Sequence, residues 1–262
     1  MMHGELRTRE QGASHEAAAT APRTRPVIAI DGPAGAGKST LAAHLARRFG
    51  FLNLETGAMY RALALKAIEN DFSFDEEDAL LALAEETRIE LQPHPEGNRV
   101  LLDGMDVSRR IRETDVTSAA SRVSVHPGIR AWMVEHQRAL GATGGVVMEG
   151  RDIGTAVFPD AEVKIFLDAA PEVRGNRRFR QAAPGDTPSS AREESSPSSE
   201  QERIARQTVL DEMRERDRRD RNRAESPLRA AADAVIIDST AMTLGEVLAH
   251  AEQIVLAHLP TA

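Results

Sequence analysis

Glycine, lysine and serine recur near the start of the chain with a spacing that suits phosphate binding. The stretch AIDGPAGAGKST, residues 29–40, places Gly32, Gly37, Lys38 and Ser39 in the order G-x-x-x-x-G-K-S. In such a loop the glycines let backbone N–H groups surround phosphate oxygens, the lysine reaches the β- and γ-phosphates, and the serine binds Mg²⁺. An apolar run precedes the loop and a helical pattern follows it, so we predict a nucleoside triphosphate site.

Two further segments carry charges that suit a second phosphate group. In VVMEGRD, residues 146–152, an apolar run leads to Glu149, Arg151 and Asp152. An arginine beside a phosphate cleft is typical of small-molecule kinases, because phosphoryl transfer depends on positioning and charge neutralisation. The stretch RERDRRDRNR, residues 214–223, is either a solvated helix with ion pairs or a source of arginines for the transferring phosphoryl group. The N-K-x-D motif of switch GTPases does not occur in the sequence.

Composition limits the classes of protein that fit. The chain has 262 residues, 41% of them hydrophobic, and no cysteine, which excludes disulfides and thiolate chemistry. A net charge of −8 argues against binding nucleic acid. Apolar runs never reach the length of a membrane span, so we expect no membrane contact. Residues 1–25 lack the apolar centre of a signal peptide and are expected to form a disordered tail on a cytoplasmic protein.

Apolar runs alternate with helical patterns along the rest of the chain. This order predicts an α/β fold with a parallel sheet and helices on both faces. A hairpin is expected from the runs at 89–91 and 100–102, and the Pro- and Ser-rich stretch 182–199 is expected to be a mobile loop. The expected strands are 27–30, 51–54, 146–148, 163–167 and 235–237, and the expected helices are 38–49, 58–69, 78–87 and those flanking 126–128.

Taken together, these segments resemble the bacterial cytidylate kinases, which are nucleoside monophosphate kinases of the P-loop NTPase class. The resemblance covers roughly residues 27–256 and rests on IDGPAGAGKST, ETGAMYRALAL, AASRVSVHPGIR, GRDIGTAVFP and RDRNR. It implies a five-stranded parallel sheet flanked by helices in a core of residues 26–62, 131–170 and 224–262. It also implies an NMP-binding insert of about 63–130 and a lid of about 171–223.

The implied reaction transfers the γ-phosphoryl group of ATP to CMP or dCMP, with Mg²⁺, in pyrimidine nucleotide metabolism. The implied enzyme is a cytoplasmic monomer that binds ATP and CMP or dCMP but neither nucleic acid nor membrane. A kinase of UMP, dTMP or shikimate type is the nearest alternative. A non-catalytic nucleotide-binding module with an arginine-rich surface for a partner is another. Turnover measured with different acceptors distinguishes the first alternative from a CMP kinase. Retention of activity in Lys38→Ala would favour the second alternative over an enzyme.

The resemblance also assigns roles to individual residues. ATP phosphates are bound by Gly32, Pro33, Ala34, Gly35, Ala36, Gly37, Lys38, Ser39 and Thr40. CMP is bound by Thr56, Tyr60, Arg61, Ser121, Arg130, Arg151, Asp152, Arg216, Asp220 and Arg223, of which Ser121, Arg130 and Asp152 contact the cytosine edge. The catalytic set is Lys38, Arg151, Arg216 and Arg223, and the metal contacts are Ser39, with ATP, and Glu149 through water.

Cytosine suits the Ser121, Arg130 and Asp152 set because its amine donates while N3 and O2 accept, whereas uracil presents O4 instead of the amine. Residue type alone leaves other roles open: Tyr60 could be a core residue, Ser121 could interrupt a helix, and Asp152 could cap a turn. The chain also departs from the family, which often has Asp-Ser-Gly in place of the Glu55–Gly57 tripeptide and Asp in place of Glu149.

Overall fold

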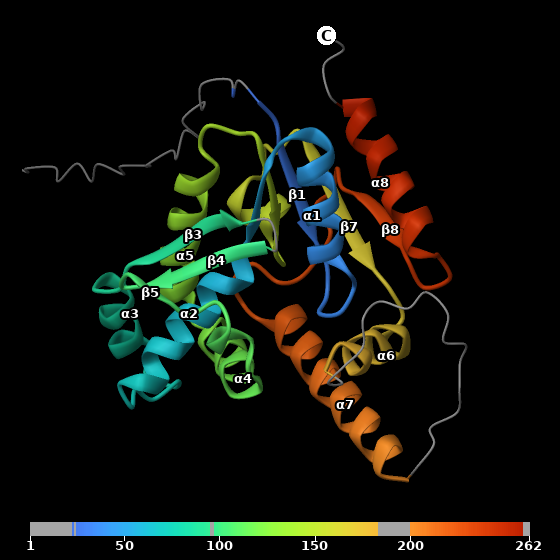
Figure 1. Ribbon diagram of the computed structural model, residues 1–262. Helices are drawn as coiled ribbons and strands as arrows, with labels where there is room; N and C mark the ends of the chain where they lie inside the picture. Colours follow the sequence, from blue (N-terminus) through green and yellow to red (C-terminus); the bar gives the residue numbers. More distant parts are fainter. Residues whose placement is uncertain (1–22, 24, 95–96, 183–199, 259–262) are drawn as a thin grey trace, which may run out of the picture.

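Five parallel strands form the central sheet of the molecule (Figure 1). The computed structural model describes residues 23, 25–94, 97–182 and 200–258. All neighbouring strands in this sheet pair in parallel, so the predicted P-loop fold with five parallel strands is confirmed. Across the sheet the strands follow the order β2 (Leu52–Glu55), β6 (Val146–Glu149), β1 (Val27–Asp31), β7 (Val163–Asp168) and β8 (Val235–Asp238).

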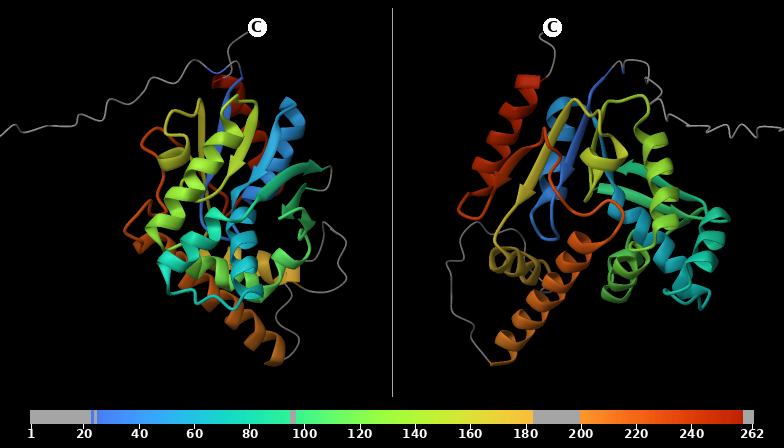
Figure 2. Two further views of the ribbon diagram at one scale, coloured as in Figure 1. Left: turned by 90° about the vertical axis from the view of Figure 1, so that its left-hand side faces the viewer. Right: turned by 180° about the vertical axis from the view of Figure 1, so that it is seen from behind.

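Helices cover both faces of this sheet (Figure 2). Side chains along a strand point alternately to the two faces, and in β1 Val27 and Ala29 join one apolar cluster while Ile28 and Ile30 join the other. The uninterrupted apolar run at 27–30 is therefore that of a strand buried on both sides. One face is covered by α1 (Lys38–Phe49) and α8 (Leu244–His258), and the other by α2 (Thr56–Glu69) and α5 (Pro127–Gly141).

The chain between α2 and α5 forms a lobe that includes a small antiparallel sheet and shares one apolar cluster with a face of the central sheet. The hairpin is present and its strands are longer than expected, and the additional strand β5 was not expected from the sequence. A two-residue turn at Asp103 and Gly104, with φ values of 50° and 85°, pairs β5 with β4. The elements of this lobe are α3 (Glu77–Glu85), β3 (Ile89–His94), β4 (Gly97–Leu102), β5 (Met105–Asp106), the 3₁₀ turn η1 (Arg110–Arg112) and α4 (Thr114–Val123).

Two helices that pack against each other, α6 (Pro171–Ala182) and α7 (Glu200–Asn222), follow β7. They coincide with the segment for which a lid was expected. The predicted mobile loop, residues 182–199, lies outside the described residues except for the last residue of α6. Another unexpected element is a π-helical turn η2 (Ile153–Val157), which directly follows the GRD sequence.

The start of the chain differs in part from the disordered tail that was expected for residues 1–25. Residues 1–22 and 24 lie outside the described part. Arg23, however, hydrogen-bonds to Asp160 and Glu162, and Arg25 donates to the carbonyl oxygen of Gly50 over 2.7 Å. The described structure therefore begins earlier than residue 26, because these two side chains find partners on the core.

Candidate functional site

A hollow of about 1470 Å³ lies at the carboxyl ends of the central strands. Ligands of open parallel sheets bind in this place, because the loops that follow the strands meet there. The loop after β1 forms one wall, and α4, α6 and α7 contribute others. The hollow is lined by all of the predicted site residues except Gly32 and Pro33, which lie at the base of the loop.

The loop between β1 and α1 has a backbone that only glycine accommodates at key points. Gly32, Gly35 and Gly37 have φ values of 148°, 73° and 102°, which side chains rarely tolerate. A Cβ atom on Gly32 would lie 2.0 Å from the carbonyl oxygen of Leu167. Helix α1 begins at Lys38, directly after the loop, so its N-terminal N–H groups and positive dipole end favour an anion here.

Lys38 lies buried inside this loop. Its Nζ donates a hydrogen bond to the carbonyl oxygen of Pro33 over 2.8 Å. Burial lowers the pKa of Lys38 to about 7, the positive charge of Arg151 adds to the effect, and Glu149 opposes it. A phosphate beside Nζ would favour the charged amine, so the loop and its lysine together form a site for an anion.

Two carboxylates stand at the ends of β2 and β6, next to the loop. Glu149 is 4% exposed, and its Oε1 has no hydrogen-bond partner among the described residues. Burial raises the pKa of Glu149, as does the nearby Glu55, while Lys38 and the Ser39 hydroxyl oppose the rise. Burial acts on Glu55 in the same direction, but Arg61 outweighs it and holds the pKa of Glu55 below its usual range. Glu55 is thus paired with Arg61, whereas Glu149 keeps one carboxylate oxygen without a hydrogen bond from the described residues.

Thr56 was predicted to bind the phosphate of CMP and lies in the wall of the hollow. Its hydroxyl donates to the carbonyl oxygen of Glu149 over 2.8 Å. The only proton of this hydroxyl is therefore engaged in joining the first residue of α2 to the end of β6. Its oxygen can still accept a hydrogen bond, and the predicted contact with CMP stays a prediction.

Ser121, Arg130 and Asp152 come together in the hollow from three different segments. The guanidinium of Arg130 pairs with the carboxylate of Asp152, and both side chains are buried. Arg130 also lies over the ring of Tyr60, 5.9 Å from its centroid. Within the described structure, the Ser121 hydroxyl and Nε of Arg130 have no hydrogen-bond partner. The patch therefore offers a donor, an acceptor and an arginine to a flat polar ligand.

Tyr60 packs against the apolar cluster that the insert shares with the central sheet, and it also lines the hollow. Its predicted contact with CMP stays a prediction. Burial raises its pKa to about 12, partly opposed by Arg130, so the phenol is neutral at ordinary pH. Ser121 does not interrupt a helix, because α4 continues past it to Val123.

A cluster of arginines surrounds Asp220 on the α7 side of the hollow. Nε of Arg151 lies 3.0 Å from Asp220 Oδ2, and Nη1 of Arg223 lies 3.7 Å from Oδ1. Arg216 lines the same wall, and its Nε lacks a partner among the residues described. Burial, together with the charge of Arg151, lowers the pKa of Arg216 to about 10. One carboxylate among three arginines leaves a positive field that suits phosphate oxygens.

Several side chains around the site were not singled out from the sequence. Asp31 accepts the backbone N–H groups of Ile153 and Gly154, 2.8 and 2.7 Å away, and so holds the turn after Asp152. Two arginines of α6, Arg174 and Arg177, bind carbonyl oxygens of the phosphate loop. Their spacing of three residues places both on one side of a helix, which is visible in the sequence. The sequence does not indicate that their partners are backbone carbonyl groups.

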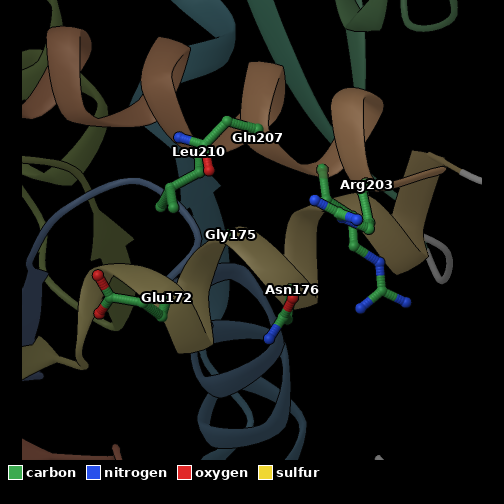
Figure 3. A pocket seen from close by; sticks show the side chains of 7 residues that line it. Glu172, Gly175, Asn176, Arg203, Gln207 and Leu210 are labelled. Carbon is green, nitrogen blue, oxygen red and sulfur yellow. The ribbon is translucent and has the colours of Figure 1, made fainter. Parts of the chain in front are cut away.

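A smaller hollow of about 340 Å³ lies between α6 and α7, away from the predicted residues (Figure 3). Its wall combines polar side chains with the close packing of Gly175 and Leu210, where a Cβ on the glycine would lie 3.2 Å from Leu210 Cδ1. Other residues of the same two helices, among them Arg177 and Arg216, line the large hollow. We assign no role in the reaction to it.

Comparison with known proteins gives a consistent result. Residues 28–257 match the family model described as cytidylate kinase. A cytidylate kinase of Aeromonas salmonicida (strain A449) is 46% identical over 87% of this chain and 93% of its own length. A cytidylate kinase of Pelotomaculum thermopropionicum is 48% identical over 85% of this chain and 92% of its own. A third, from Vibrio cholerae, is 44% identical over 87% of this chain and 95% of its own.

Proposed function

Because the chain belongs to the cytidylate kinase family, we propose that the large hollow is the place where its two nucleotides meet. The chain is an ATP-dependent nucleoside monophosphate kinase, which transfers the γ-phosphoryl group of ATP to CMP or dCMP. In this reaction the bond between the γ-phosphorus and the ADP oxygen breaks, and a bond to a phosphate oxygen of CMP forms. The acceptor oxygen is already anionic, so no side chain has to remove a proton from it.

The observation that carries the proposal is the arrangement of two different binding surfaces around one hollow. The glycine loop with Lys38 offers an anion site on one side. The patch of Ser121, Arg130 and Asp152, called the cytosine patch below, offers hydrogen-bonding groups on the other side. Arg151 and Arg216 lie in the same hollow, where transferred charge would develop. Fixed positive charge of this kind stabilises a phosphoryl group in transfer.

We assign the donor to the glycine loop. ATP phosphates would be bound by the backbone of residues 32–40 and by Lys38. The catalytic set would be Lys38 together with Arg151, Arg216 and Arg223. We assign the phosphate of CMP to Arg61, Arg151 and Arg223, with Arg216 and Asp220 near the sugar and phosphate. The amine of cytosine would donate to Asp152, and its acceptors would face Arg130 and Ser121.

Residues near the loop also fit a Mg²⁺ ion that binds together with ATP. Mg²⁺ takes one or two protein oxygens and completes its shell with water and phosphate. Ser39 is the second residue of α1, directly after the loop, and the buried Oε1 of Glu149 has no protein partner in the described ranges. We propose that these two hold the ion, Glu149 through water. When bound, the ion neutralises charge on the β- and γ-phosphates.

We further propose that the enzyme acts as a cytoplasmic monomer. All groups assigned here come from one chain, so the site is complete without a partner copy, and the use of ATP supports a cytoplasmic location. Within the described residues, every helix is too short or too polar to cross a bilayer.

The first test compares acceptors. Release of ADP from Mg-ATP is measured with CMP, dCMP, UMP, AMP, GMP and dTMP under the same conditions. Turnover with CMP and dCMP well above the others supports the assignment of the cytosine patch. Turnover of UMP equal to or above that of CMP would overturn it.

The second test uses Ser121→Ala. The hydroxyl has no partner within the described structure, so its removal leaves the fold intact. The loss of one neutral hydrogen bond to cytosine raises KM for CMP about five- to tenfold, while KM for ATP stays unchanged. Steady-state kinetics with either nucleotide varied measures both constants.

The matched control is Ser73→Ala, the same change at an exposed position between α2 and α3 that does not line the large hollow. It should leave both KM values unchanged. An equal rise of KM for ATP and CMP in Ser121→Ala would show that Ser121 does not contact the base.

A further inference from the structure

Arg174 lies on α6 and contacts three other parts of the chain. Its side chain is buried, and Nε donates to the carbonyl oxygen of Ala169 over 2.8 Å. Nη1 donates to the carbonyl oxygen of Ala34 over 2.9 Å, and Nη2 lies 2.7 Å from Oδ2 of Asp217. One guanidinium therefore joins the end of β7, the phosphate loop and α7.

The contact with Ala34 determines how the loop presents its backbone. In a trans peptide the carbonyl group and the following N–H point in opposite directions. With the carbonyl of Ala34 turned toward Arg174, the N–H of Gly35 points away from that arginine. Arg177 acts in the same way two residues further along the loop, because its Nη1 lies 3.2 Å from the carbonyl oxygen of Ala36. Both arginines thus fix peptide groups that a phosphate would use.

The loop also packs directly on the two helices. A Cβ atom on Gly35 would lie 2.8 Å from Cε of Met213 on α7 and 3.1 Å from the carbonyl oxygen of Arg174. Asp217 is buried, and in the described part of the chain its Oδ1 has no hydrogen-bond partner, so Arg174 is its charged contact. A small shift of the Arg174–Asp217 pair would therefore move the phosphate loop.

We propose that Arg174 is a positioning residue for bound ATP, which orients the phosphate loop through Ala34 and is itself held in place by Asp217. The inference rests on the proposed function, since it requires ATP phosphates in the loop. It concerns the donor side of the reaction, because neither side chain belongs to the cytosine patch.

The decisive variant is Asp217→Asn, which keeps the size of the side chain and an oxygen for Arg174 but removes the charge. Loss of a charge-assisted contact that orients the loop raises Kd for Mg-ATP about tenfold. Titration calorimetry with Mg-ATP and no acceptor measures this constant directly. KM for CMP stays within about twofold, because distant and unshared contacts do not couple.

Arg174→Lys gives the complementary variant, since an ammonium cannot reach all three partners at once. It should raise Kd for Mg-ATP at least as much as Asp217→Asn does. The double variant should be no weaker than Arg174→Lys alone, because both changes remove the same contact. Fully additive losses would show that the two residues act separately and would overturn the proposal.

The matched control is Glu172→Gln. Nη2 of Arg214 lies 2.9 Å from Oε1 of Glu172, and this exposed pair joins the same two helices beside the smaller hollow, where Figure 3 shows Glu172. Its loss should leave Kd for Mg-ATP unchanged. A fall in Tm of Asp217→Asn without a change in Kd would mean that the buried pair is only structural. An enzyme that binds Mg-ATP normally but does not phosphorylate CMP would contradict the proposed function and leave this inference standing.

Discussion

Asp31 connects the strand that carries the phosphate loop with the turn that follows Asp152. Its carboxylate is 4% exposed and accepts the N–H groups of Ile153 and Gly154. Burial raises its pKa from 3.8 to about 6, Asp152 adds to the rise, and the two backbone donors and Lys38 oppose it. Burying this carboxylate is unfavourable, but its hydrogen bonds fix the backbone that follows Asp152.

This gives a pH dependence of stability that Asp31→Asn removes. Between pH 3.8 and about 6 the folded protein binds the Asp31 proton more tightly than the unfolded chain does. The contribution of Asp31 to the free energy of unfolding therefore falls as pH rises through this window, by roughly 3 kcal/mol in total. Asparagine does not titrate, although its NH₂ group faces a backbone N–H and lowers stability equally at each pH.

Urea unfolding of both proteins at several pH values from about 4 to 7.5 measures the difference. We expect the wild type to lose stability relative to Asp31→Asn as pH rises. The control is Asp103→Asn: the hydrogen bond from Lys66 lowers the pKa of Asp103 below 3.8, so its contribution is fully present above that pH and its effect is constant in this window. A constant difference for Asp31→Asn as well would contradict the assignment.

The residues that could be predicted were those whose types and spacing match a known motif and that line the large hollow. The glycine loop is specified by its own spacing, and Ser121, Arg130 and Asp152 were identified by resemblance and do lie together in the hollow. Asp31 and Arg174 could not be found in this way. Their partners are backbone N–H and carbonyl groups of distant segments, and such partners leave no pattern of residue types in the sequence.

At the scale of elements, β2 is an edge strand that the insert protects. The side chain of Asn98, on β4, accepts the N–H of Glu55 over 2.9 Å and donates to the carbonyl oxygen of Asn53 over 2.7 Å. An edge strand leaves such groups unpaired unless another element covers them. One buried amide therefore joins the small sheet to the large one, next to the carboxylate that pairs with Arg61.

Asn98→Ala leaves both backbone groups of β2 without these partners. We expect the free energy of unfolding to fall by about 2 kcal/mol, because unsatisfied buried polar groups are costly. Asn70→Ala is the control, since Asn70 also bonds a backbone carbonyl, that of Lys66, but at an exposed helix end. Urea unfolding compares the two, and an equal small loss in both would show that Asn98 does not join the sheets.

The elements that were predicted well carry strong local signals. Helix α1 has the predicted bounds because Gly37 and Gly50, both with positive φ, mark its ends. Strand β5 is two exposed residues long, too short for an alternating pattern. The π-helical turn η2 depends on the buried carboxylate of Asp31, which is distant in sequence. Long periodic segments are thus encoded locally, and these short ones by tertiary contacts.

At the scale of the whole molecule, the large hollow and the contacts of Arg23 lie at opposite ends of the central sheet. The hollow is at the carboxyl ends of the strands. At the amino ends, Nη2 of Arg23 lies 2.6 Å from Asp160 Oδ2, and its guanidinium lies over the ring of Phe158, 5.1 Å from the centroid. The neighbouring Glu162 accepts both Arg23 and the N–H of Val27. Arg23 is therefore expected to affect stability without affecting chemistry.

Arg23→Ala tests this separation. We expect the free energy of unfolding to fall by about 1 kcal/mol, because the ion pairs of a buried guanidinium with two partly exposed carboxylates and a cation–π contact are lost together. Both KM values and kcat should match the wild type, since the site is at the other end of the sheet. Arg88→Ala is the control: its pair with Glu90 is exposed, and its loss should change stability by less than about 0.5 kcal/mol. A changed KM with unchanged stability in Arg23→Ala would show that the two ends of the sheet are coupled.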